Sequence, residues 1–116
     1  MNRKTKPAST SNDRFEQQEL LSGFVRLHIL HHAAAKPVVG HWMMQELARH
    51  GYRLSAGTLY PMLHALERKG YLRSAGKRSG RRSWREYRST PVGRKALRAA
   101  KGKLRELFRE LIEEED

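Results

Sequence analysis

The chain of 116 residues carries a formal net charge of +12, from 24 Lys and Arg against 12 Asp and Glu, and contains no cysteine. This length suits a single domain, and the missing thiols exclude disulfides and cysteine-ligated metal sites. No apolar run approaches the roughly 18 residues that cross a membrane, so we expect a cytoplasmic protein without a membrane partner.

The N-terminal segment, residues 1–12, is basic and lacks a hydrophobic stretch, which predicts a disordered basic arm rather than a secretory signal. A first helix is predicted over about 13–34, and it ends before Pro37 because a residue that precedes proline disfavours helical geometry. Its broad apolar face comprises Leu20, Leu21, Phe24, Val25, Leu27 and Leu30.

Three histidines on this helix, His28, His31 and His32, have a spacing that can present two imidazoles to one metal ion. The chain has no cysteine, and no nearby carboxylate completes a tetrahedral ligand set within the motif. We therefore expect no metal and no cofactor, and interpret these histidines as surface or interface residues.

Two further helices are predicted over about 39–50 and 55–70, joined by the short turn 51–54. Gly51 and Gly70 are suited to the left-handed positions that end helices, and Ser55 is expected to cap the third helix with its side chain. Two short helices joined by a tight turn form a helix-turn-helix.

The third helix has two different faces. Leu59, Met62, Leu63 and Leu66 share the apolar face at helical spacing. The opposite face is small near its start and cationic further along. It carries Gly57, Pro61, His64 and Arg68, flanked by Thr58 and Tyr60. Few bulky groups on this face let the backbone approach a large partner closely.

After Gly70 the composition predicts two strands, 71–74 and 83–88, around a polar loop over 75–82. Leu72 and Tyr87 are the predicted inward anchors. Seven cations surround this hairpin: Arg73, Lys77, Arg78, Arg81, Arg82, Arg85 and Arg88. Because their mutual repulsion is costly unless phosphates neutralise it, we interpret the hairpin as a wing that follows a nucleic-acid backbone.

A long last helix is predicted over 91–113, with Thr90 as its cap and Pro91 in its first turn. Leucines at heptad spacing, widened by Phe108 and Ile112, indicate an apolar stripe that packs on a second subunit. We expect residues 91–116, including an acidic tail, to form a dimerisation helix. The predicted interface comprises Leu20, Phe24, Leu27, Leu97, Leu104, Leu107, Phe108 and Leu111.

Positive charge is concentrated in residues 68–103. This segment holds nearly all the Lys and Arg residues of the C-terminal half of the chain, and its single acidic residue is Glu86. A single sign on one third of a chain favours a polyanionic partner, and double-stranded DNA is the usual one. The predicted fold is mainly α (α+β): a winged helix-turn-helix domain over 13–90, followed by the dimerisation helix.

The run Ser55-Ala56-Gly57-Thr58-Leu59-Tyr60-Pro61, followed by Leu63, Leu66-Glu67 and Gly70-Tyr71-Leu72, resembles the recognition-helix signature of PadR-family transcriptional regulators. The resemblance extends from Gly40 to Tyr87, Thr90 and Gly93, and covers roughly residues 20–111 in the subgroup with one C-terminal helix.

The resemblance implies a homodimer that usually represses transcription, and in some members a small aromatic or lipophilic effector enters the dimer interface and releases DNA. It implies these DNA-facing positions: Ser55, Gly57, Thr58, Tyr60, Pro61, His64, Arg78, Arg81 and Arg82. The cationic helix face and the wing add Arg68 and Lys77 to the predicted DNA-binding residues.

Two positions depart from the family pattern. Ser89 replaces a commonly apolar residue, and we expect it to loosen the end of the second strand. Trp42 stands where a smaller aromatic or polar residue is common. Trp42, Met43, Met44 and Phe24 either line an effector pocket or belong to the core, and we favour the core.

Three functions fit these patterns: a dimeric repressor, a sequence-neutral architectural protein that binds nucleic acid, and a module that docks an acidic protein. The architectural role would require only the positive charge, but this interpretation leaves the small side chains on the outer face of the third helix unexplained. We find no nucleophile–base grouping and no glycine-rich phosphate loop, so we expect no enzyme. The first interpretation is favoured.

Overall fold

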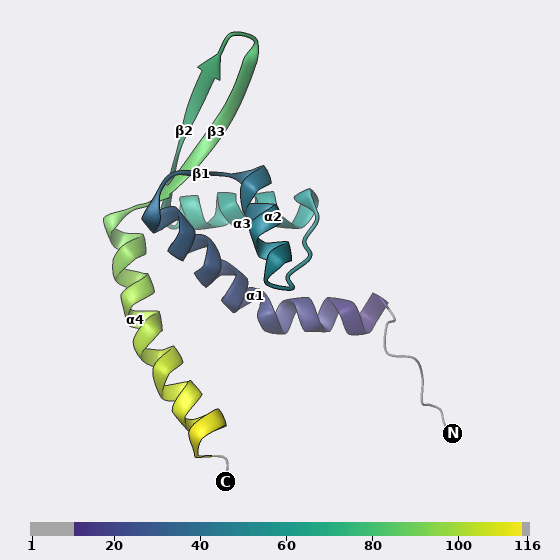
Figure 1. Ribbon diagram of the computed structural model, residues 1–116, viewed down its shortest axis with the longest axis vertical. Coiled ribbons are helices and arrows are strands. Elements are labelled where there is room, and N and C mark those ends of the chain that lie inside the picture. Colours follow the sequence, from purple (N-terminus) through teal and green to yellow (C-terminus); the bar gives the residue numbers. More distant parts are fainter. Residues whose placement is uncertain (1–10, 115–116) are drawn as a thin grey trace.

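Within residues 11–114, which the computed structural model describes, the chain forms four α-helices and one three-stranded antiparallel sheet (Figure 1). The predicted α+β class is confirmed. Of the predicted basic arm, only Ser11 and Asn12 lie in this range, and they begin α1. In chain order the elements are α1 (Ser11–Ala35), β1 (Val38–Val39), α2 (Gly40–Arg49), α3 (Ala56–Arg68), β2 (Leu72–Ser79), β3 (Arg82–Ser89), α4 (Pro91–Phe108) and a π-helical segment (Arg109–Glu113).

The helix-turn-helix predicted from the sequence is formed by α2 and α3. Gly70 follows α3 with a φ of 85°, and the next amide, that of Tyr71, donates to the Leu66 carbonyl over 2.9 Å. This closure requires a left-handed residue, which glycine supplies without steric cost. A similar closure ends α2 at Gly51, whose φ is 92°. Both predicted helix ends are confirmed.

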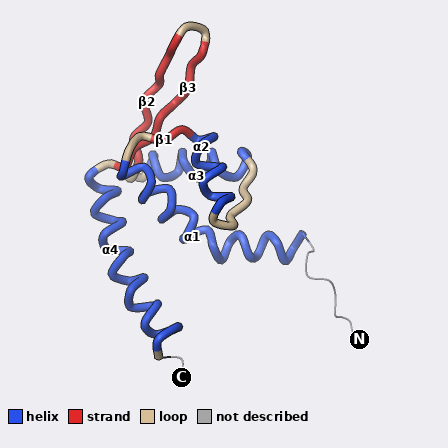
Figure 2. The backbone as a smooth tube through the Cα atoms, viewed as in Figure 1, coloured by secondary structure: helices blue, strands red, loops and turns tan. Residues whose placement is uncertain are grey.

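The hairpin is longer than predicted. The predicted loop 75–82 is wrong, because strand pairing continues to Ser79 and Arg82 and leaves a two-residue turn at Gly80 and Arg81. Gly80 has the positive φ, 62°, that such tight turns require. The strands extend beyond the helices into solvent (Figure 2), so neither face needs the apolar alternation that marks a half-buried strand.

A short strand that the sequence interpretation missed completes the sheet. In β1, Val38 pairs with Tyr87 and Val39 with Glu86, which places β3 in the centre of the order β1-β3-β2. Two β-branched residues directly after Pro37 favour this extended geometry. The predicted start of the second helix at 39 is therefore one residue early.

The hydrophobic core lies between α1, α2, α3 and the base of the hairpin. The predicted anchors Leu72 and Tyr87 are both 2% exposed, which confirms their inward positions. Leu97 of α4 joins this core, whereas Leu20, Leu21 and Phe24 of the predicted apolar face of α1 are exposed. The buried apolar residues are Val25, Ile29, Leu30, Ala33, Val38, Met43, Leu47, Leu59, Leu63, Leu66, Leu72, Tyr87 and Leu97.

The junction between β3 and α4 is closely packed. Thr90 caps α4 as predicted, accepting a hydrogen bond from the Gly93 amide over 3.0 Å, and Pro91 lies in the first turn. Gly93 lies against the carbonyl oxygen of Tyr71, where a Cβ atom would collide with backbone. Only glycine fits this approach without a shift of one of the two segments.

Ser89 strengthens the strand end that we expected it to loosen. It is 2% exposed, and its hydroxyl donates to the Leu30 carbonyl of α1 over 2.8 Å. Strand pairing with Leu72 persists at this residue. The prediction was wrong because the buried hydroxyl finds an acceptor, which removes the cost of burying a polar group.

Candidate nucleic-acid interface

Helix α3 divides into a buried and an exposed face, as its residue pattern predicts. Leu59 and Leu63 are 0% exposed and Leu66 is 4% exposed, so one side of the helix is fixed in the core. The exposed residues of the predicted DNA-facing set are Ser55, Gly57, Thr58, Pro61, His64 and Arg68. Their small side chains near the start of α3 leave its backbone accessible.

The start of α3 is capped differently from the prediction. Ser55 occupies the cap position, but its side chain makes no capping hydrogen bond and instead lies 3.3 Å from the Thr58 hydroxyl. The Ser55 carbonyl accepts from the amides of Thr58 and Leu59, over 3.0 and 2.9 Å. The preceding first-turn amides have no intrahelical acceptor, which is the geometry that suits a phosphate oxygen.

Tyr60 differs from the other predicted contact residues because it is half-buried. Its ring lies against Gly40, the first residue of α2, so closely that any side chain at Gly40 would overlap it. Tyr60 therefore holds α3 against α2 with part of its surface, and only the remaining part faces solvent.

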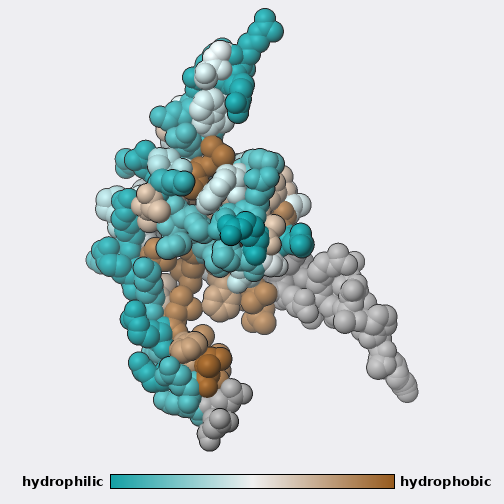
Figure 3. All heavy atoms as spheres, in the orientation of Figure 1, coloured by the Kyte–Doolittle hydropathy of each residue, from teal (hydrophilic) through white to brown (hydrophobic). Residues whose placement is uncertain are grey.

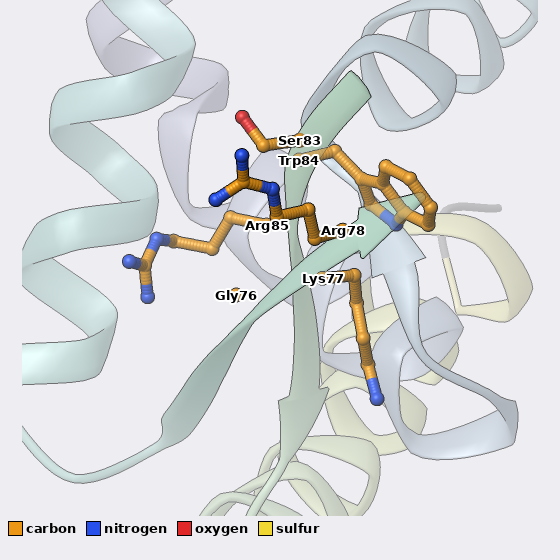
Figure 4. Close-up of a pocket in the computed structure, with 6 residues that line it drawn as sticks. All are labelled: Gly76, Lys77, Arg78, Ser83, Trp84 and Arg85. Atoms are coloured by element: carbon orange, nitrogen blue, oxygen red, sulfur yellow. The ribbon is translucent and has the colours of Figure 1, made fainter. Parts of the chain in front are cut away.

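The hairpin distributes its cations over both faces. Side chains alternate along a strand, and the pairing of Lys77 with Trp84 places these two on one face, while Arg78 and Arg85 lie on the other (Figure 4). Every residue from 75 to 83 is exposed. The wing can therefore meet phosphates on either side.

Trp84 organises the cationic face near the tip. The Arg82 guanidinium lies 5.5 Å from the Trp84 ring centre, within the range of a cation–π contact. The indole nitrogen of Trp84 donates to Glu86 over 3.1 Å, which engages the single acid of the hairpin. Arg82 is thereby given a preferred position, while its charge remains available to an anion.

A chain of hydrogen bonds that the sequence interpretation missed couples α3 to the wing. One oxygen of Glu67, near the end of α3, accepts from the Ser74 amide over 3.1 Å and from its hydroxyl over 2.8 Å. Arg85 on the opposite strand donates to the same hydroxyl over 3.0 Å. The partners lie 7 and 11 residues apart, so only the hairpin register could have indicated this contact.

The structure does not bring the four candidate pocket residues together. Met43 belongs to the core, Trp42 and Met44 are partly buried against it, and Phe24 is 38% exposed on α1. Phe24 instead lines a shallow hollow between α1 and α4. That hollow is bordered by Leu20, Gly23, Phe24, Arg26, Leu27, Leu30, Leu66, Tyr71 and Ala96.

Most of the predicted dimer residues lie on the surface of the single chain. Leu107 is 39% exposed, Phe108 52% and Leu111 57%, while Leu27 and Leu104 are half-buried. Leu97 is buried in the core of its own chain. Figure 3 shows the apolar residues gathered on the side of α4 that faces α1.

Comparison with known proteins places this arrangement in a family. Residues 29–99 match the transcriptional regulator PadR-like family. The chain is 53% identical over 95 residues to the transcriptional regulator Rv3488 of Mycobacterium tuberculosis, covering 82% of this chain and 89% of that protein. The chain belongs to the PadR-like family.

Solved PadR-family structures share the fold. A regulator from Eggerthella lenta has a TM-score of 0.74 at 28% identity, covering 86% of this chain and 90% of its own. A PadR-like regulator from Bacillus cereus, at 22% identity and a TM-score of 0.67, covers 81% and 96% and shows the fold alone. The predicted winged helix and the resemblance to PadR regulators are thus confirmed.

Membership of the PadR-like family settles the class of function. These relatives are transcriptional regulators rather than enzymes, so the protein is a regulator of transcription and its winged helix serves DNA binding. No helix within the described residues is long and apolar enough to cross a membrane.

Proposed function

We propose that this PadR-family regulator is a homodimeric repressor that inserts α3 into the major groove of a pseudo-palindromic operator. The observation that carries the proposal is the hydrogen-bonded coupling of α3 to the cationic wing through Glu67, Ser74 and Arg85. This coupling fixes the distance between the helix that would read bases and the arginines that would hold phosphates.

The exposed apolar residues of α1 and α4 support a two-fold assembly. Phe108, Leu111 and Ile112 are all more than half exposed, and Leu20 is 79% exposed. Phe108, Leu111 and Ile112 follow one another at helical spacing, and exposed apolar residues grouped in this way mark an interaction surface. In the proposed dimer, α4 of one subunit packs against α1 of the other, and the two recognition helices face the same side of the DNA.

Repression is the regulatory act that this proposal favours, because a dimer that occupies promoter DNA blocks access to it without a further contact. The hollow between α1 and α4, about 450 Å³ in volume, adjoins the proposed interface. We propose it as the site of a small aromatic or lipophilic effector, which would alter the angle between the subunits and release DNA.

A sequence-neutral architectural protein remains the alternative, and a gel-shift comparison separates it from the repressor. The purified protein is titrated onto DNA from the upstream region of its own gene and onto random DNA of equal length. Specific binding is typically at least about 10³-fold tighter than non-specific binding at physiological salt. Equal affinities would contradict the operator model, and a protein that binds neither DNA would favour the acidic-partner interpretation.

A further inference from the structure

Three histidines from α1 and the end of α2 converge at one place. His28 and His32 lie on α1, and His50 directly follows α2. One ring nitrogen from each lies within 4.8 Å of the corresponding atoms of the other two. A tetrahedral ion with metal–nitrogen bonds of about 2.0–2.1 Å needs these atoms roughly 3.3 Å apart. A bound ion would therefore have to draw the three nitrogens together by side-chain rotation.

A carboxylate borders the cluster on the side of His32 and His50. Glu46 is 8% exposed, and its Oε2 lies 3.2 Å from Nε2 of His50 and 3.6 Å from Nε2 of His32. Its other oxygen accepts from Arg49 over 2.7 Å, which orients the carboxylate toward the imidazoles. Burial alone would raise the pKa of Glu46, but the hydrogen bonds from Arg49 and His50 outweigh it and lower the pKa.

The cluster differs from the histidine motif seen in the sequence. His31 is exposed and outside the group, and its place is taken by His50, which the turn after α2 brings to α1. The missing carboxylate is supplied by Glu46, one helical turn before His50. The expectation of no metal depended on the ligands of one helix, and the fold adds two from another.

The surroundings favour the neutral form of His28 and His32 and hold the rings of the cluster in place. Burial, followed by the neighbouring histidines, lowers the pKa of His28, and burial also lowers that of His32. The His28 ring stacks on His50 with centroids 4.9 Å apart, and Trp42 meets His32 edge-on at 5.5 Å. Neutral imidazole is the form that ligates metals.

We propose that His28, His32 and His50, with Glu46 as the fourth ligand or as the group that orients them, bind one divalent transition-metal ion per chain. Three imidazoles and a carboxylate suit Zn²⁺ and its neighbours rather than Mg²⁺ or Ca²⁺, which prefer oxygen-rich sites. His50 is the most exposed of the three, with 44% of its side chain open to solvent, so the ion has a route of entry.

The site joins α1 to the end of α2, immediately before the turn that leads into α3. A bound ion would therefore fix the angle between α1 and the helix-turn-helix. The effect of this angle on operator affinity rests on the proposed function, because α1 belongs to the proposed dimer interface. Metal binding itself does not, and it can be measured without DNA.

The test uses the full, tag-free chain after removal of metal with a chelator. Titration with Co²⁺ should produce the visible absorption of a four-coordinate ion, saturating at one equivalent per chain, and Zn²⁺ should abolish that absorption. The double variant His28→Ala/His50→Ala should lose the absorption and bind Zn²⁺ at least tenfold more weakly. Glu46→Gln should weaken binding roughly 10- to 100-fold.

His31→Ala and His41→Ala are the matched controls, since both remove an exposed histidine of α1 or α2 that supplies no nitrogen to the cluster. His31 only meets the His32 ring edge-on, with centroids 5.0 Å apart. Both control variants should retain the Co²⁺ spectrum. His50→Ala alone, at an exposed helix end, gives a second variant if the double variant fails to fold by circular dichroism. The proposal is overturned if the cluster variants bind Co²⁺ as the unmodified chain does, or if the control variants lose Co²⁺ binding to the same degree. It is also overturned if the unmodified chain gives only the weak spectrum of a six-coordinate ion.

Discussion

At the scale of single residues, the backbone approach at Gly93 decides how α4 joins the domain. The glycine packs directly on the Tyr71 carbonyl, and that segment also connects α3 to the wing. A change at this point therefore affects core packing and the geometry of the DNA-binding elements together. Gly102 lies in the same helix with open space around it, and offers a direct comparison.

Gly93→Ala should lower the free energy of unfolding by roughly 1–3 kcal/mol, because its Cβ must displace backbone rather than a flexible side chain. Gly102→Ala should instead raise it by roughly 0.5–1 kcal/mol, since alanine is the better helix former. Urea unfolding of both variants measures the difference. A stabilised Gly93→Ala would show that the two segments separate without cost.

Side-chain substitutions can also distinguish the residues that position the protein on DNA phosphates from those that read the bases. Arg81→Ala with Arg82→Ala should weaken operator and random DNA by similar factors, because phosphates carry no sequence information. Each lost phosphate contact lowers the slope of log affinity against log salt by about 0.9. Titrations at three salt concentrations measure this slope. Arg105→Ala with Arg109→Ala removes the same charge near the far end of the chain and should leave the slope nearly unchanged.

Thr58→Ala and His64→Ala should behave in the opposite way. Both side chains are exposed on α3, where a helix in the major groove meets base edges. Losing one good base contact should cost about 1–3 kcal/mol of operator affinity with little change in salt slope. Equal weakening on operator and random DNA would contradict sequence reading by this helix. Tyr60 is a poorer probe, because its ring also packs on α2.

At the scale of elements, the end of α4 and the π-helical segment after it form the surface that the single chain leaves uncovered. Leu97, in the first half of α4, is buried against the chain's own core, whereas Leu111 and Ile112 of the π-helical segment are both 57% exposed. The first half of α4 is therefore fixed by the domain, and its end together with the π-helical segment is the part proposed to contact another subunit.

Leu111→Asp should convert the proposed dimer into a folded monomer. The residue is exposed in the single chain, so the substitution costs the isolated fold little, but an unpaired carboxylate in an apolar seam is expensive. Analytical ultracentrifugation gives the mass, and circular dichroism gives the helix content. Lys103→Asp, on the exposed polar side of α4, should remain dimeric. A dimeric Leu111→Asp variant would place the interface elsewhere.

The element boundaries show what the sequence could predict. Apolar spacing and glycine stops predicted α2 and α3 to within one or two residues, because those signals are local. The hairpin length was missed because Ala75 to Arg82 carry no apolar alternation, and β1 because two residues are too short to form a pattern. Contacts between distant segments, such as Ser89 with Leu30, depend on tertiary packing that no local pattern encodes.

The same distinction applies to the sites. The exposed face of α3 could be predicted, because helical periodicity assigns it directly, and the cationic character of the wing could be predicted from its charge alone. The Glu67–Ser74–Arg85 chain and the grouping of His50 with His28 could not. Both require knowing which elements meet, and charge or spacing within one element does not contain that information.

At the scale of the whole molecule, the described chain is elongated, with principal extents of 60 × 33 × 24 Å, and its wing and α4 extend in opposite directions (Figure 1). In the proposed complex, DNA contact and assembly therefore lie at opposite ends of the chain. A two-fold axis through the α4 end would leave both α3–wing units free to reach one duplex.

Footprinting should therefore show a pseudo-palindrome, with the centres of its half-sites one helical turn, or a multiple of it, apart. The physical reason is that an isologous dimer presents two identical recognition helices related by a two-fold axis. Inserting five base pairs between the half-sites puts them on opposite faces of the duplex and should abolish tight binding. Protection without symmetry would contradict the dimeric operator complex.

The division of α3 into a core face and an outer face also bears on how such regulators diverge. Leu59, Leu63 and Leu66 hold the helix in place, while Thr58 and His64 contribute nothing to the buried core. Mutations on the outer face can therefore accumulate one at a time without lowering stability, so duplicated genes are free to acquire new target promoters. The wing, which we propose contacts only phosphates, would need no matching change, so the same scaffold would serve each new target.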